Sequence, residues 1–361
     1  MDFWDVPGPR GFINDVIDAV LDGKAVFVHL PANCPAGLEY ALETRLGLHE
    51  SILEPASPLS ERLLLEVSEV DRAEAPRIDA QFLAERLGGR SFVIDCSVQE
   101  RALILEGELL AFANIARTQA HGERPMFLVF LRGKAASRVR KTKSTTVAHL
   151  SWDGYVSGID MLLYTIYTLR AGNNWRDRLK ARIISELACY DPAVVDALAA
   201  CDPDSVSQVS RALHELAISR GWTAGPPVWG DGAVASVNGI NEFHSAHPSF
   251  AGLQYRIWRA QVAELFPVLE TRRQDIVRRY ESLLTLPTDH DRFIETVRDL
   301  EFGHVFYQLR DMRGMISIDE LSRLRRWRDI RNSLAHGEVV EISRLDDDLF
   351  LSQSENLADA S

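Results

Sequence analysis

The sequence predicts an α/β domain followed by an all-α helical bundle. In the first ~170 residues, short apolar runs alternate with helical patterns, which is typical of a mostly parallel sheet with helices on both faces. A purely helical pattern follows and, after a stretch rich in Gly and Pro, helical periodicity returns near the end of the chain. At 361 residues the chain is long enough for two domains.

The strands and helices of the α/β domain follow from the apolar pattern. Short apolar runs predict strands at residues 24–31, 63–70, 91–98, 126–131 and 146–151. Longer segments with helical spacing predict helices at residues 36–48, 79–87, 100–120 and 155–169.

The remaining chain divides at its Pro and Gly residues. We predict the α/β domain at residues 1–172, a small helical, lid-like subdomain at 173–221, a connector at 222–249, the helical bundle at 250–345 and an acidic tail at 346–361. The bundle should contain three helical segments, the first with a bend near Pro267 and the second covering residues 291–312.

Composition narrows the function classes. A net charge of −12 argues against general affinity for nucleic acids. Because no apolar run approaches the roughly 18 residues of a membrane span, and the first residues do not resemble a signal peptide, we expect a cytoplasmic protein without membrane contact. Four scattered cysteines without a CxxC pair indicate no zinc site, so no metal is expected.

The place where a nucleotide-binding P-loop would open the domain lacks the required chemistry. Residues 31–38, PANCPAGL, offer no Lys for phosphate oxygens and no Ser or Thr for magnesium. The strand at 126–131 ends in Leu131 and Arg132 where a magnesium-associated carboxylate would stand. The order of elements nevertheless resembles the NTPase module of the AAA and STAND families. Because both nucleotide motifs fail, we expect no cofactor and no ATPase activity. The resemblance then implies a degenerate module that senses a signal or docks a protein partner; an unrelated doubly wound domain is the alternative.

A basic stretch follows the strand at 126–131. It holds six cations and no acidic residue. As candidate phosphate contacts these are Arg132, Lys134, Arg138, Arg140, Lys141 and Lys143. A solvated loop is the alternative, since charge runs usually are solvated.

Residues 328–338, RDIRNSLAHGE, contain the strongest catalytic candidate. RNA cleavage through the 2′-hydroxyl needs proton transfer and stabilisation of an anionic intermediate, for which His and Arg are suited without a metal. R-N-S-L-A-H resembles the Arg-x4-6-His motif of HEPN domains, helical bundles that include metal-independent ribonucleases. The resemblance implies Arg331 and His336 as the active pair with Asn332 as supporting residue. Four preceding arginines are candidate RNA contacts: Arg323, Arg325, Arg326 and Arg328.

The spacing of this pair leaves an alternative open. Five residues along a helix separate two side chains by about 140°, so Arg331 and His336 do not share one face. Two arrangements would still bring the pair together: a helix that ends near Ala335 and releases His336, or a two-fold dimer that places two copies of the pair in one cleft. HEPN enzymes use the second, so the resemblance implies a homodimer through the bundle. Alternatively, His336 and Gly337 simply end the helix, since a cation and an αL glycine suit that position.

Three further constellations carry weaker signals. His244 and His247 have a spacing that metal ligands can use, but Pro248 favours an ordinary loop. Ser157 misses the nucleophile-elbow pattern by one position. Asp95 at a predicted strand end is a catalytic candidate or a helix cap.

Three function hypotheses follow. The first is a metal-independent endoribonuclease effector joined to an inactive NTPase-like domain; the HEPN resemblance implies a role in bacterial antiviral defence or toxin systems. The second is a non-enzymatic adaptor in which both modules have lost their chemistry. The third is a nucleic-acid-binding regulator that uses the basic stretch.

Overall fold

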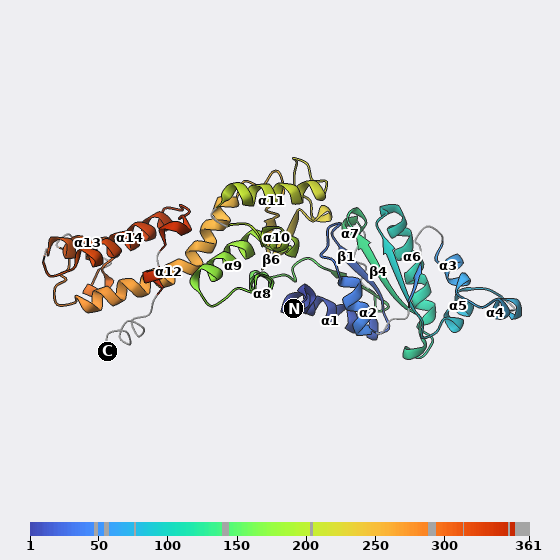
Figure 1. The fold of residues 1–361 in the computed structure, drawn as a ribbon. Helices are drawn as coiled ribbons and strands as arrows, with labels where there is room; N and C mark the ends of the chain where they lie inside the picture. Colours follow the sequence, from blue (N-terminus) through green and yellow to red (C-terminus); the bar gives the residue numbers. More distant parts are fainter. Residues whose placement is uncertain are drawn as a thin grey trace. The chain divides into compact units, whose positions relative to one another are not determined.

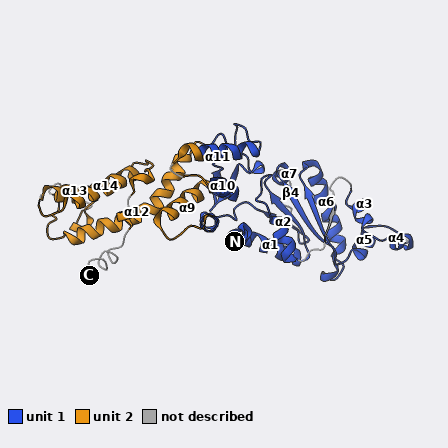
Figure 2. Cartoon of the chain, in the orientation of Figure 1, with its two compact units in different colours: residues 1–168, 188–198, 210–250 blue, residues 169–187, 199–209, 251–361 orange. Residues whose placement is uncertain are grey.

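The computed structural model describes residues 1–46, 50–53, 58–75, 77–138, 144–202, 205–287, 294–312, 314–345 and 347–350. The chain forms two compact units, each assembled from segments distant in sequence (Figure 2). Unit 1 comprises Met1–Thr168, Ala188–Leu198 and Ser210–Phe250, and unit 2 comprises Leu169–Leu187, Ala199–Val209 and Ala251–Ser361. This division differs from the predicted boundaries, because the residues predicted as one helical subdomain are shared between both units.

A parallel sheet forms the core of unit 1 (Figure 1). Its strands are β1 (Ala25–Leu30), β2 (Glu50–Leu53), β3 (Ser91–Cys96), β4 (Met126–Arg132) and β5 (Val147–Ser151), in the order β2-β3-β4-β1-β5. All four strand pairs are parallel. The chain leaves β1 toward one edge of the sheet and leaves β4 toward the other edge. The topological switch point, where ligands of such sheets bind, therefore lies between β1 and β4.

Helices cover the sheet on both faces, which confirms the predicted α/β class. They are α1 (Pro7–Leu21), α2 (Leu38–Leu46), α3 (Leu59–Leu65), α4 (Glu69–Glu74), α5 (Ala80–Arg86), α6 (Gln99–Ala116), α7 (Lys134–Arg138) and α8 (Gly158–Leu169), with 3-10 turns at η1 (Phe3–Asp5) and η2 (His121–Glu123). Side chains of α3, α5 and α6 pack on the face that carries Phe27, Phe92 and Val129. α1 lies against β1, β4 and β5.

Three elements of this region differ from the prediction. Residues 63–70, predicted as a strand, form the end of α3 and the start of α4. Leu59, Leu63 and Val67 are buried at helical spacing, and the Ser68 hydroxyl caps α4 by accepting the N–H of Asp71 at 3.1 Å. Helix α1 and the edge strand β2 were not predicted. The PGPRG start of α1 indicates a turn, but it places Pro at the favoured first helical position.

The middle of the chain contains the predicted helices and an unpredicted hairpin. The helices are α9 (Trp175–Ala188), α10 (Pro192–Leu198) and α11 (Val206–Ser219). Within the predicted connector, η3 (Trp229–Asp231) precedes an antiparallel hairpin of β6 (Val234–Val237) and β7 (Ile240–Phe243). Asn238 and Gly239 turn the hairpin with φ of 51° and 79°, as an Asn-Gly pair favours.

The helices after the hairpin belong to unit 2. They are α12 (Leu253–Arg279), α13 (Phe302–Asp311) and α14 (Ile318–Ala335), with 3-10 turns η4 (Val297–Asp299), η5 (Ile342–Arg344) and η6 (Asp347–Leu349). α12 continues through Pro267, where a bend was predicted. The helix predicted at 291–312 begins only at Phe302, and residues 291–293 lie outside the described residues. The Trp258 indole donates to the Leu334 carbonyl at 2.7 Å and ties α12 to α14.

In the part of the chain described, no helix combines the length and the apolar character that crossing a membrane requires.

Candidate functional site

The predicted catalytic residues lie at the carboxyl end of α14. Ser317 begins this helix by accepting the N–H of Glu320 at 3.1 Å. One face of the helix is buried, and Arg331 projects from a half-buried position beside it. The buried face consists of Leu324, Trp327, Ile330 and Leu334.

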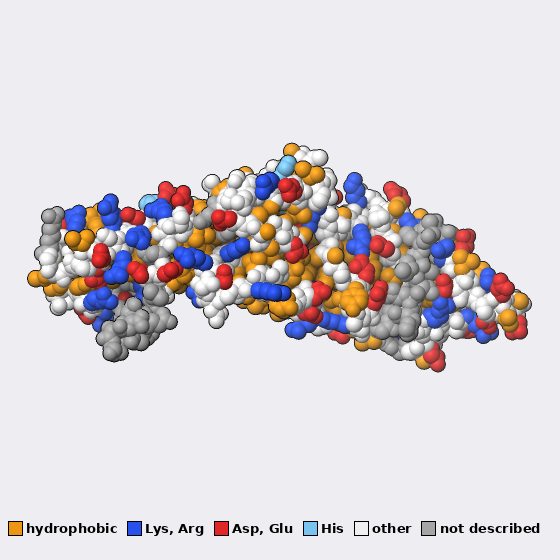
Figure 3. All heavy atoms as spheres, in the orientation of Figure 1, with side chains coloured by type: hydrophobic (Ala, Val, Ile, Leu, Met, Phe, Trp, Pro, Cys, Tyr) orange, Lys and Arg blue, Asp and Glu red, His pale blue; other side chains and the backbone are white. Residues whose placement is uncertain are grey.

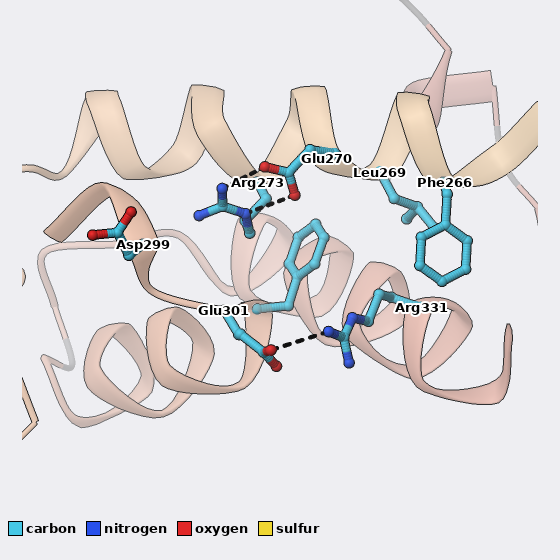
Figure 4. A pocket seen from close by; sticks show the side chains of 8 residues that line it. Phe266, Leu269, Glu270, Arg273, Asp299, Glu301 and Arg331 are labelled. Carbon is cyan, nitrogen blue, oxygen red and sulfur yellow. Dashed lines mark hydrogen bonds and ion pairs between the residues drawn. The ribbon is translucent and has the colours of Figure 1, made fainter. Parts of the chain in front are cut away.

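Arg331 lines a pocket of about 220 Å³ formed by α12, the start of α13 and α14, which we call the Arg331 pocket (Figure 4). The Arg331 guanidinium lies 3.2 Å from the Glu301 carboxylate. On the opposite wall, Glu270 and Arg273 of α12 form a second ion pair. Apolar walls come from Phe266, Leu269 and Phe302.

The Arg331 pocket carries more acid than base. Glu270, Asp299 and Glu301 outnumber the two guanidiniums. Hydrogen bonds from Arg273 hold the pKa of Glu270 below its ordinary value, and hydrogen bonds from Thr296 do the same for the pKa of Asp299. Arg273 also donates to two backbone carbonyls at 2.7 Å. A pocket with net negative charge, whose cations are engaged, is unfavourable for a phosphate group.

His336 lies outside the Arg331 pocket, exposed at the C-cap of α14. Gly337 has φ of +81°, and its N–H donates to the Leu334 carbonyl at 3.1 Å. The N–H of Glu338 donates to the Ser333 carbonyl at 2.9 Å, which completes a Schellman motif. Within one chain the described structure therefore does not bring His336 to Arg331, and the local geometry is the one that the helix-end alternative requires.

The other predicted RNA contacts stand among carboxylates. Asn332 and Arg326 are exposed on α14. The three remaining arginines lie close to Asp side chains: Arg323 to Asp348 at 3.4 Å, Arg325 to Asp329 at 4.0 Å and Arg328 to Asp329 at 2.7 Å. On the face of the helical unit drawn in Figure 3, basic and acidic side chains are interspersed. Such mixing weakens the positive field that RNA binding needs.

The switch point in unit 1 is filled by the chain itself. The loop at residues 31–37, the β1–α2 loop, follows β1, and its Ala32 N–H donates to the Gly230 carbonyl of η3 at 2.8 Å. The side-chain amide of Asn33 donates to the backbone carbonyl of Asp231 at 2.9 Å. A Cβ on Gly230 would lie 3.2 Å from the Gly133 carbonyl oxygen just after β4, so η3 approaches both strand ends closely. One backbone N–H of the loop at the switch point, that of Ala32, is therefore bonded within the chain.

The basic stretch is only partly described. Arg132 forms ion pairs with Glu39 and with Asp95, whose carboxylate lies 3.0 Å from its Nε. The ion pair with Asp95 gives both residues a structural role: Arg132, a predicted phosphate contact, and Asp95, a predicted catalytic or capping residue, neutralise each other. Lys134 is exposed at the start of α7, and Arg138 ends that helix. Arg140, Lys141 and Lys143 lie outside the described residues.

Unit 1 also contains a buried charged cluster that was not predicted from the sequence. The Asp191 carboxylate lies 2.8 Å from Nε2 of His244 and forms an ion pair with Arg220, which lies over the Trp222 ring. Asp191 and His244 are 4% and 0% exposed. Burial alone would raise the pKa of Asp191, but the hydrogen bonds and charges of His244 and Arg220 hold that pKa far below its ordinary value. FHSAHP drew attention to His244, but its partner is 53 residues away.

Comparisons with known proteins add little. No family model matches the chain, and no curated protein matches it. Among solved structures, a Signal Transduction ATPase with Numerous Domains (STAND) protein with a tetratricopeptide repeat sensor from Pyrococcus horikoshii aligns with a TM-score of 0.32 at 9% identity. The alignment covers 90% of this chain and 56% of that chain, so this chain spans little more than half of that protein's length.

Proposed function

We propose that this protein is a non-enzymatic adaptor whose NTPase-like unit binds no nucleotide. The observation that carries the proposal is the bond between the Ala32 N–H and the Gly230 carbonyl at the switch point of the sheet. A phosphate-binding loop leaves its N–H groups for the ligand. Here η3 takes that place, and the loop sequence provides neither the Lys nor the hydroxyl that a nucleotide needs.

Further contacts support a permanent position for η3. The Tyr190 hydroxyl donates to the Gly232 carbonyl at 3.0 Å inside unit 1. Gly232 has φ of +76°, and a Cβ there would touch the β1–α2 loop at Asn33. Gly230 and Gly232 therefore allow a close backbone approach that side chains would obstruct.

An exposed apolar face supports the docking role. Four side chains of α8 recur at helical spacing and are 38–67% exposed: Ile159, Leu163, Ile166 and Tyr167. The charged residue of this helix, Asp160, is buried and accepts the N–H of Gly8 at 3.0 Å. Grouped apolar side chains of this kind are typical of protein interaction sites.

The test is nucleotide binding by calorimetry. ATP and ADP, each with Mg²⁺, are titrated into the full chain at concentrations up to the millimolar range. We expect no saturable heat and no ATP hydrolysis. Saturable binding that disappears on Asn33→Ala, a change on the β1–α2 loop surface, would show a working nucleotide site and refute the adaptor.

A metal-independent ribonuclease is the second candidate. Its support is the exposure of Asn332 and His336 at one helix end, where a second copy of the chain would bring its own His336 toward Arg331. Labelled RNA is incubated in EDTA with wild type, Arg331→Ala and His336→Ala, and the mass of each sample is measured. Cleavage by a wild-type dimer that both folded variants lack would establish this function. Intact RNA with unchanged fold and mass would leave the adaptor.

A further inference from the structure

Unit 2 holds a stretch of its own chain on its surface. This C-terminal segment follows α14, and the structure describes its residues 338–345 and 347–350. Three apolar side chains anchor it, since Val340, Leu345 and Leu349 are 1%, 4% and 0% exposed. Exposed residues precede or separate these anchors: 338–339, 341, 343–344 and 347–348. One side of the described segment therefore faces solvent, as it does in a peptide bound to a protein surface.

Two side chains of α12 bind the backbone of the C-terminal segment. The Gln261 amide donates to the Val340 carbonyl at 2.6 Å, and the Gln261 side-chain oxygen accepts the Val340 N–H at 2.8 Å. Nε of Arg272 donates to the Leu349 carbonyl at 2.8 Å. Because these contacts are made to backbone atoms, they do not depend on which side chain the bound residue carries.

Helix α9 recognises side chains near the end of the described segment. The Phe350 ring stacks on the Trp175 indole, with ring centroids 4.4 Å apart and planes 5° from parallel. Nε1 of Trp175 donates to the Asp347 carboxylate at 2.7 Å, and the Arg176 guanidinium lies 3.5 Å from the same carboxylate. The surface formed by Trp175, Gln261 and Arg272, which we call the segment-binding surface, therefore reads a carboxylate and an aromatic ring as well as the backbone.

The shape of the C-terminal segment comes from bonds within the segment. In η5 the N–H of Arg344 donates to the Glu341 carbonyl at 3.0 Å, and in η6 the N–H of Phe350 donates to the Asp347 carbonyl at 2.9 Å. A separate peptide can form the same two turns, since each bond joins residues three positions apart. The link to α14 is the exposed Gly337, whose φ of +81° lies in a region that glycine adopts without steric cost.

We propose that the segment-binding surface is a peptide-binding site, which the C-terminal segment occupies as an internal ligand and from which a free peptide of the same chemistry displaces it. The ligand class is a short peptide with apolar anchors spaced like Val340, Leu345 and Leu349, an aromatic residue directly after the last anchor and a carboxylate two positions before that anchor. The tether gives the internal ligand an effective concentration in the millimolar range, so a partner binds when its contacts are stronger or when the tethered segment is weakened.

This site would give the proposed adaptor a docking surface in unit 2, but it does not depend on the switch point of unit 1. Nucleotide binding would refute the adaptor and leave the peptide site intact. Failure of peptide binding would remove the peptide site and leave the switch point as it is. The two experiments therefore test separate claims.

The test adds a labelled peptide of residues 338–350, with blocked ends, to the full chain. In the double variant Leu349→Ala with Phe350→Ala, the tethered segment loses a buried anchor and its stacked ring, whereas the free peptide keeps both. Fluorescence anisotropy should show saturable binding to this variant and about tenfold or more weaker binding to wild type, whose intact segment competes. Circular dichroism checks the fold, and Phe350→Ala alone replaces the double variant if that variant unfolds. A folded variant that binds no peptide at millimolar concentration would overturn the proposal.

Matched changes in the peptide and in the surface test the specificity of binding. A peptide with Leu349→Ala should bind about tenfold or more weaker, because Leu349 is the fully buried anchor. A peptide with Val339→Ala, which truncates a 38% exposed residue, should bind within about threefold of the original. Trp175→Ala, added to the variant chain, should weaken binding by about tenfold through loss of the stacking surface for Phe350. Equal affinities for the two altered peptides, or binding unchanged by Trp175→Ala, would contradict recognition at this surface.

Discussion

The switch point of unit 1 and the Arg331 pocket of unit 2 differ in how their polar groups are engaged. At the switch point, backbone groups bond to backbone groups across a close glycine approach, and the nearby charged cluster is buried. In the Arg331 pocket, the Arg331 and Glu301 side chains are 31% and 58% exposed. The switch point of unit 1, which lacks the P-loop motif, is therefore held by more buried contacts. Unit 2 keeps the motif residues Arg331 and His336, but the described chain does not bring them together. Sequence motifs and site geometry must be judged separately.

The largest expected effect tests the buried side of this comparison. Asp191→Ala leaves Arg220 and His244 buried without their carboxylate, which should cost about 3–5 kcal/mol of unfolding free energy. Denaturant unfolding followed by circular dichroism measures the change. As matched control, Asp329→Ala on α14 removes a 38% exposed carboxylate and should cost less than about 1 kcal/mol. A loss of similar size in both variants would remove the contrast between the two regions.

Acid should remove the stabilising contribution of Asp191. Because His244 and Arg220 hold the pKa of Asp191 below its ordinary value, its contribution is present above about pH 3.9 and decreases as pH falls toward the folded pKa. In Asp191→Asn this contribution is missing, so the unfolding free energy should vary less between pH 4 and pH 2 than in wild type. Parallel acid titrations of both proteins check this, and superimposable slopes would count against it.

The filled switch point predicts an intermediate effect. In Gly230→Val, a Cβ would lie 3.2 Å from the Gly133 carbonyl oxygen, a backbone atom that cannot rotate away. Overpacking of this kind typically costs about 1–3 kcal/mol. Gly225→Ala is the matched control, since its Cβ meets nothing within 4 Å. Unfolding free energies that are equal for the two variants would show that η3 is not held tightly against the strand ends.

Much of the fold was predictable because its signals are local. β1 and β4 are buried along almost their whole length, so each stands out as a continuous apolar run. The run at residues 63–70 was predicted as a strand because a short apolar segment has no period that separates a strand from a buried helix. The hairpin β6-β7 could have been found from its Asn-Gly turn.

The sites were less predictable because their partners are far apart in sequence. Arg331 was singled out from its motif, but its ion-pair partner Glu301 lies 30 positions earlier, just before α13. Asp191 and Arg220 pair across 29 positions, and no local pattern marks either residue. The spacing of Arg331 and His336 in the sequence identified them as catalytic candidates. The carboxylates around Arg331 come from other helices and turns, so the sequence did not reveal the negative charge of its pocket.

The smallest expected effect tests the exposed side of the comparison. Arg331→Ala removes an ion pair whose partners are both partly in water, so the unfolding free energy should change by less than about 1 kcal/mol. His336→Ala should be equally mild, because the helix end is fixed by backbone bonds at Gly337 and Glu338 rather than by the imidazole. Denaturant unfolding of both variants checks this. A loss above about 2 kcal/mol for Arg331→Ala would mean that the Arg331 pocket is a structural element. Small losses in both variants would make them suitable for the ribonuclease test, since any loss of cleavage would then be chemical.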